Sequence, residues 1–94
     1  MANSYRKAVF TTATLVADMA TTTGGPAVVI QNNSGAPIFV GGKDVTAANG
    51  FSLATGAALC STIDGSEAIY CVTSTTTQTV QIFRTNVPNT PFHA

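Results

Sequence analysis

The chain has 94 residues and a formal net charge of zero, and only 9% of its residues are charged, against about 25% in a typical soluble domain. This length supports one domain with one modest core and argues against a second domain. The balanced charge supplies no basic stripe for nucleic acid, and no apolar run approaches the roughly eighteen residues of a membrane helix, so we expect neither partner. Sixteen Thr and six Ser replace the missing charges, and β-branched Thr favours strands.

Residues 1–26 are predicted to form an N-terminal strand or extended arm followed by a loop. Apolar and polar residues alternate imperfectly over 8–17, which indicates extended chain. Residues 18–26 have no period and end in Gly24-Gly25-Pro26, a group of turn-forming residues.

A β core is predicted over residues 27–86, and it begins with a hairpin over residues 27–40. The apolar, β-branched run 27–32 ends in the turn-forming sequence Asn33-Ser34-Gly35, and a second apolar run follows at 37–40. Pro37 has no N–H to donate, so it must lie at a strand start or on a sheet edge.

The second half of the core is predicted to hold four more strands. Residues 51–53 form a short strand after the turn at Asn49-Gly50, and residues 57–63 and 67–73 pair as a hairpin around residues 64–66. Residues 78–84 (QTVQIFR) show the clearest period of two, with Val80 and Ile82 on one face. Residues 87–94 contain two prolines and are expected to form an extended tail.

Six to seven short antiparallel strands with almost no helical signal predict a small single-domain β-sandwich or barrel of the jelly-roll type. In this interpretation, the N-terminal arm and the C-terminal tail extend from the domain and reach neighbouring subunits.

The two cysteines allow two predictions. If the hairpin between residues 57 and 73 turns at Gly65-Ser66, Cys60 lies directly opposite Cys71, and a disulfide can form. A turn at Asp64-Gly65 separates the two residues, and a free thiol is in any case a common small core residue.

Catalytic chemistry has no support in the sequence, so we expect no enzyme, no cofactor and no metal. The single histidine, His93, lies in the proline-bearing tail, where it is poorly placed to act as a general base. Asp64 and Glu67 would be close in the predicted turn, but a solvated turn explains them better than a carboxylate pair does. Gly41-Gly42-Lys43-Asp44 lacks the spacing of a phosphate-binding loop.

Binding or assembly therefore remains as the expected role, and aromatic, apolar and exposed charged residues outside the predicted core are candidates for an interface. These candidates are Tyr5, Phe10, Leu15, Lys43, Asp44 and Phe92.

Residues 28–84 resemble small structural proteins of tailed-bacteriophage virions. The resemblance is carried by Asn33-Ser34, Pro37-Ile38, Val40-Gly41-Gly42, Asp44-Val45-Thr46, Asn49-Gly50, Leu53, Gly56 and Ile69-Tyr70. It implies a virion component and no catalytic residues. The resemblance does not settle where on the particle the protein lies. The compact β domain, the near-absence of charge and the two ends suited to reaching neighbours lead us to expect a capsid decoration or cement protein, a homotrimer that binds the major capsid protein on the particle surface. The alternative is a receptor-contacting or structural module of a fibre or tail.

Overall fold

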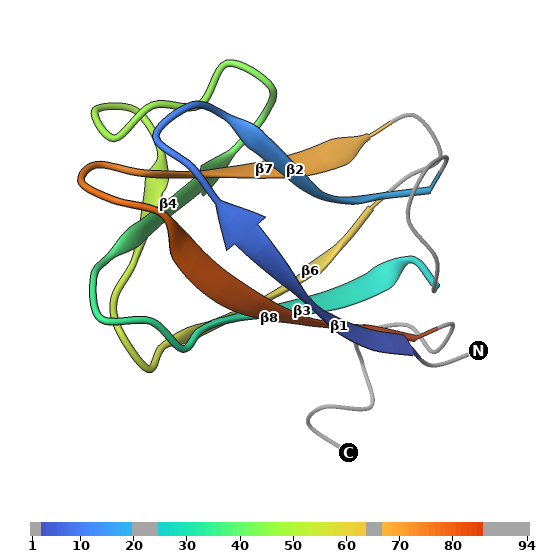
Figure 1. Cartoon of the computed structure of the whole chain (residues 1–94). Coiled ribbons are helices and arrows are strands. Elements are labelled where there is room, and N and C mark those ends of the chain that lie inside the picture. The colour runs from blue at the N-terminus through green and yellow to red at the C-terminus, as the bar shows by residue number, and fades with distance from the viewer. Residues whose placement is uncertain (1–2, 20–24, 64–66, 86–94) are drawn as a thin grey trace.

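The structure is a computed structural model that describes residues 3–19, 25–63 and 67–85. These residues form eight antiparallel strands (Figure 1), and no helix among them is long and apolar enough to cross a membrane. The strands are β1 (Asn3–Val9), β2 (Thr14–Asp18), β3 (Ala27–Asn32), β4 (Ile38–Gly41), β5 (Phe51–Leu53), β6 (Ala58–Thr62), β7 (Ala68–Thr73) and β8 (Gln78–Thr85). The predicted all-β class is confirmed, with eight strands in place of six or seven. The predicted tail, residues 87–94, lies outside the described residues.

The strands form two four-stranded sheets, one in the order β1-β8-β3-β6 and the other in the order β2-β7-β4-β5. The chain can be described as one long two-stranded ribbon whose tip is the pair β4–β5. Away from this tip, the paired strands are β3–β6, then β2–β7, and then β1–β8. Successive pairs of this ribbon alternate between the two sheets. This strand order is that of the eight-stranded jelly roll.

The core lies between the two sheets and is built by residues that alternate along each strand. On β8, Val80 and Ile82 point inward and are buried, as the period of two predicted. They belong to one cluster with inward residues of the other sheet, including Ile38, Val40 and Cys71. Burial of such aliphatic side chains stabilises the fold by about 1.5–3 kcal/mol each.

Both predicted hairpins are wrong, because their strands lie in different sheets. β3 pairs with β6 and β8, whereas β4 pairs with β5 and β7. In the same way β6 pairs with β3, whereas β7 pairs with β2 and β4. The turn-forming residues 33–35 therefore lie where the chain crosses from one sheet to the other.

The N-terminal segment forms paired strands and not an extended arm, and the single strand or arm expected over residues 8–17 is interrupted. Every residue of β1 has a partner on β8, and the chain turns at residues 10–13 before β2 joins the other sheet. The hydroxyl oxygen of Thr14 holds this turn, because it accepts from the Phe10 N–H at 3.2 Å and donates to the Thr12 carbonyl at 2.9 Å. The Tyr5 hydroxyl donates to the Val16 carbonyl at 2.7 Å and ties β1 to β2.

The outer face of the sheet β2-β7-β4-β5 is covered by the chain itself. The connection of residues 42–50 folds over this face and buries Val45 and Val72. Gly50 allows this contact, because a Cβ at that position would lie 2.7 Å from the Cβ of Phe39 and 2.8 Å from Cγ2 of Val45. One sheet is thus covered on its outer face.

Candidate binding surfaces

The outer face of the sheet β1-β8-β3-β6, called the open face below, carries two rows of side chains across all four strands. The first row is Ser4, Phe83, Val29 and Cys60, and the second is Arg6, Gln81, Gln31 and Ala58. Arg6 is the only charged residue in these two rows. The open face therefore presents amide groups and apolar groups beside a single positive charge.

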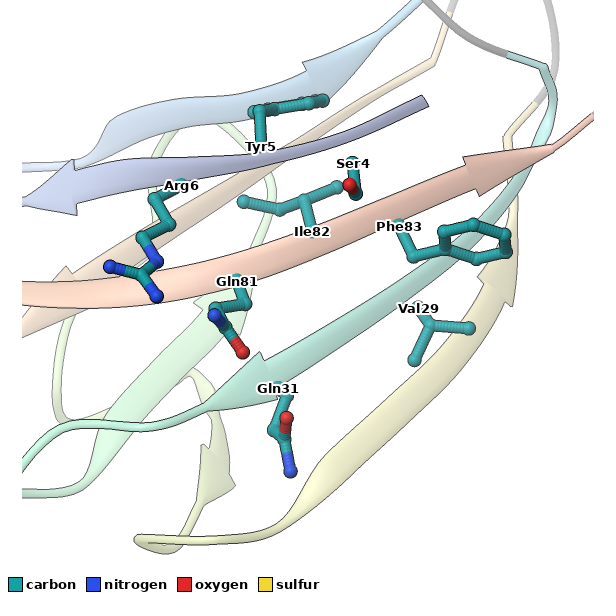
Figure 2. Close-up of a pocket in the computed structure, with 8 residues that line it drawn as sticks. All are labelled: Ser4, Tyr5, Arg6, Val29, Gln31, Gln81, Ile82 and Phe83. Atoms are coloured by element: carbon teal, nitrogen blue, oxygen red, sulfur yellow. The ribbon is translucent and has the colours of Figure 1, made fainter. Parts of the chain in front are cut away.

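A shallow groove of about 560 Å³ runs over the open face (Figure 2). Six outward residues of the two rows line it, together with parts of the inward residues Tyr5 and Ile82. Figure 2 shows Arg6, Gln81 and Gln31 as neighbours on three adjacent strands. The Phe83 side chain remains 40% exposed. This volume is within the range of about 300–1,000 Å³ that is typical of small-molecule sites.

A second surface lies at one end of the molecule, where four connections meet. These connections lie at the left of Figure 1. They are residues 10–13 between β1 and β2, 33–37 between β3 and β4, 54–57 between β5 and β6, and 74–77 between β7 and β8. None of these residues is Lys, Arg, His, Asp or Glu. We call this surface the uncharged end, and Phe10, 49% exposed, is its largest apolar side chain.

The structure does not bring together the five predicted interface residues that it describes. Tyr5 is partly buried and packs against the core, where its hydroxyl serves the inter-sheet hydrogen bond. Phe10 is exposed at the uncharged end, and Leu15 is partly buried on β2. Lys43 and Asp44 are exposed in the connection that covers the other sheet. The sixth residue, Phe92, lies outside the described residues.

Of the two possibilities for the cysteines, a disulfide or free thiols, the structure has free thiols. Cys60 is exposed on the open face, whereas Cys71 is buried in the core of the other sheet. Burial raises the pKa of the Cys71 thiol to about 12, since the thiolate would lose its hydration. Cys60 lies on β6 and Cys71 on β7, and these strands belong to different sheets, so no hairpin register places the two cysteines opposite each other.

Acidic and metal-ligating side chains form no cluster in the part of the chain that the structure describes. No group of three His, Cys, Asp or Glu among those residues could hold a metal ion. Of the two carboxylates considered above, Glu67 is exposed and Asp64 lies outside the described residues.

Of the residues that line the groove, only Tyr5 was among the predicted site residues. The sequence does contain a signal for them, because the period of two over residues 78–84 places Gln81 and Phe83 on the face opposite Val80. What the sequence does not reveal is that Arg6 and Gln31 come to lie beside Gln81, since this depends on the pairing of β8 with β1 and β3.

Comparisons of the chain with protein-family models, curated proteins and solved structures gave no match. The resemblance to tailed-bacteriophage virion proteins therefore stays a prediction.

Proposed function

We propose that the protein is a structural virion component, a capsid decoration or cement protein that binds the outer surface of a major capsid shell. The observation that carries this proposal is the uncharged end, where four connections from both sheets form a surface without a single ionisable side chain. Charged residues are depleted at the centres of protein interfaces, because an unpaired charge there would lose its hydration. The jelly roll also occurs in viral capsid domains, which supports the proposal by analogy.

Self-association is part of the same proposal, and a homotrimer is the expected form. A chain with no net charge and few surface charges has little electrostatic repulsion between copies. Cement action would then come from the contact area that each trimer adds across neighbouring shell subunits.

The test uses shells assembled without the protein, to which purified protein is added back. We expect the wild-type protein to co-sediment with the shells and to raise the temperature at which they disrupt. A Thr12→Lys/Thr76→Lys double variant, which introduces charges at exposed positions of the uncharged end, should lose most of this binding. Ala8→Lys, an exposed position on β1, is the control and should bind like the wild type.

Wild-type protein that neither binds shells nor changes their heat resistance would overturn the cement role. Equal shell binding by the double variant and the wild type would overturn the assignment of the uncharged end. Sedimentation of the isolated protein checks the trimer.

A receptor-contacting or structural module of a fibre or tail is the second candidate, and the groove on the open face favours it. This role predicts that a label on the protein marks the tail of a particle, whereas the decoration role predicts a label over the head. Imaging labelled particles separates the two roles.

A further inference from the structure

The groove on the open face combines three chemical features within two neighbouring rows of side chains. Arg6 supplies a positive charge, Gln31, Gln81 and Ser4 supply neutral hydrogen-bonding groups, and the ring of Phe83 supplies an apolar surface. Their places are fixed by strand pairing, because each belongs to a regular stretch of β1, β3 or β8. A ligand would meet a preformed site on a sheet and would not have to order a loop first.

Arg6 is held in a position that leaves part of its guanidinium available. In the amide orientation that satisfies both groups, the Gln81 side-chain oxygen accepts from Nε at 3.1 Å and from Nη2 at 3.2 Å. A guanidinium has five N–H donors in a planar fork. The two N–H groups of Nη1 and the second of Nη2 therefore remain to bind a carboxylate with two parallel hydrogen bonds.

The charge of the groove selects for a single negative charge. Arg6 is the only cation in the two rows, and they contain no acidic residue. A carboxylate carries one charge and matches the guanidinium, whereas a phosphate dianion would leave charge uncompensated here.

The neutral groups select for a ligand rich in hydroxyls. A Gln amide donates through its NH₂ and accepts through its oxygen, and a hydroxyl likewise does both. The half-exposed ring of Phe83, with Val29 beside it, offers a surface for the C–H face of a sugar ring. A sugar acid brings a carboxylate, several hydroxyls and a C–H face together in one rigid ring.

We propose that the groove on the open face binds an acidic saccharide, with the sugar carboxylate on Arg6, hydroxyls on Gln31 and Ser4, and a sugar ring against Phe83. This site is separate from the uncharged end, so it does not depend on attachment to a shell. It would supply the ligand class for the receptor-contacting role.

The test titrates the folded protein with tetragalacturonate, a hyaluronan tetrasaccharide and a disialic acid, each also as its neutral methyl ester. Binding is followed by calorimetry and by shifts of backbone amide resonances. We expect at least one acid to bind saturably with shifts on β1, β3 and β8, and its ester to bind about tenfold or more weakly. Loss of a charge-assisted hydrogen-bond pair changes affinity by about this factor.

Two variants and a matched control locate the site. Arg6→Gln should bind the acid about tenfold or more weakly, and Gln31→Glu should weaken it similarly by placing a second carboxylate in the groove. Lys7→Gln removes the same charge from the adjacent exposed residue, which lies outside the two rows, and should bind like the wild type. The proposal is overturned if none of the acids binds, if the acids and esters bind equally, or if Arg6→Gln and Lys7→Gln have equal effects.

Discussion

The side-chain amide of Asn32 donates a 2.8 Å hydrogen bond to the main-chain oxygen of Leu53 and thereby joins the two sheets. Asn32 is fully buried at the end of β3, and Leu53 is the last residue of β5 in the opposite sheet. The same amide nitrogen donates to the Ala36 carbonyl at 2.9 Å, and its oxygen accepts from the N–H and hydroxyl of Ser34. One side chain thus holds the corner at which the chain crosses between sheets.

Replacing Asn32 with Ala should lower the free energy of unfolding by about 2–4 kcal/mol, because the Leu53 carbonyl loses its buried donor and the Ala36 carbonyl keeps only the Ser34 hydroxyl, at 3.1 Å. Urea denaturation followed by circular dichroism measures the change. Asn33→Ala, at the exposed neighbouring position, is the control and should stay within about 0.5 kcal/mol of the wild type. Equal stability of the two variants would contradict this role for Asn32.

Strand positions could be predicted where the sequence has a clear period, and β8 is the best example. Alternation over residues 78–84 indicated both the strand and the inward direction of Val80 and Ile82. The runs 27–32 and 51–53 likewise matched β3 and β5. These features are local, since they depend on which face of each strand is apolar.

Strand partners could not be predicted, because in a jelly roll most neighbours along the chain lie in different sheets. Cys60 and Cys71 illustrate this, because the sequence between them is compatible with a hairpin turn. In the structure, the strand of Cys60 pairs with β3, whereas the strand of Cys71 pairs with β2 and β4. The groove was missed for the same reason, because Arg6 and Gln81 are far apart in sequence and meet only through the pairing of β1 with β8.

A methyl group at Gly50 should destabilise the protein, because the connection over residues 42–50 could no longer lie against its sheet. The added Cβ would lie 2.7 Å from the Cβ of Phe39 and 3.0 Å from the main-chain oxygen of Thr46. We expect Gly50→Ala to cost about 1–3 kcal/mol of unfolding free energy. Gly42→Ala is the matched control, because nothing lies within 4 Å of its added Cβ. Thermal unfolding of both variants provides the comparison, and a Gly50→Ala protein as stable as the control would refute this packing.

Arg84 is expected to tolerate no replacement by Lys, although both residues carry one positive charge. It is fully buried, and its Nε and Nη1 donate to the main-chain oxygens of Gly25 and Asp18 at 3.0 and 2.8 Å. A lysine ammonium carries its three donors on one nitrogen and cannot reproduce this planar fork. Arg84→Lys should cost about 2–4 kcal/mol in urea denaturation, whereas Arg6→Lys, at an exposed position, should be close to neutral. If Arg84→Lys left the free energy of unfolding nearly unchanged, the two carbonyls would not need separate donors.

The two thiols should react very differently with a disulfide reagent in the native protein. The reactive species is the thiolate, and Cys60 is exposed whereas Cys71 is buried with a pKa of about 12. At pH 8 we expect one thiol per native chain to react quickly, and two after unfolding in denaturant. Cys60→Ser should leave no rapidly reacting thiol in the native state. Two fast thiols in the native wild type would contradict the burial of Cys71.

Burial of Cys71 should also make stability fall at high pH. Its pKa is about 12 in the folded protein against 9.0 for an ordinary thiol, so the unfolded chain releases this proton first. The stabilisation is therefore complete below pH 9 and is lost progressively between pH 9 and pH 12, with a slope of up to about 1.4 kcal/mol per pH unit. Denaturation of the wild type and of Cys71→Ala, both kept reduced, is compared at each pH. Because both proteins contain the same tyrosines, the difference between them isolates the effect of Cys71. The stability difference between the two proteins should shrink as the pH rises through this window, and a constant difference would show that Cys71 does not stay protonated in the fold.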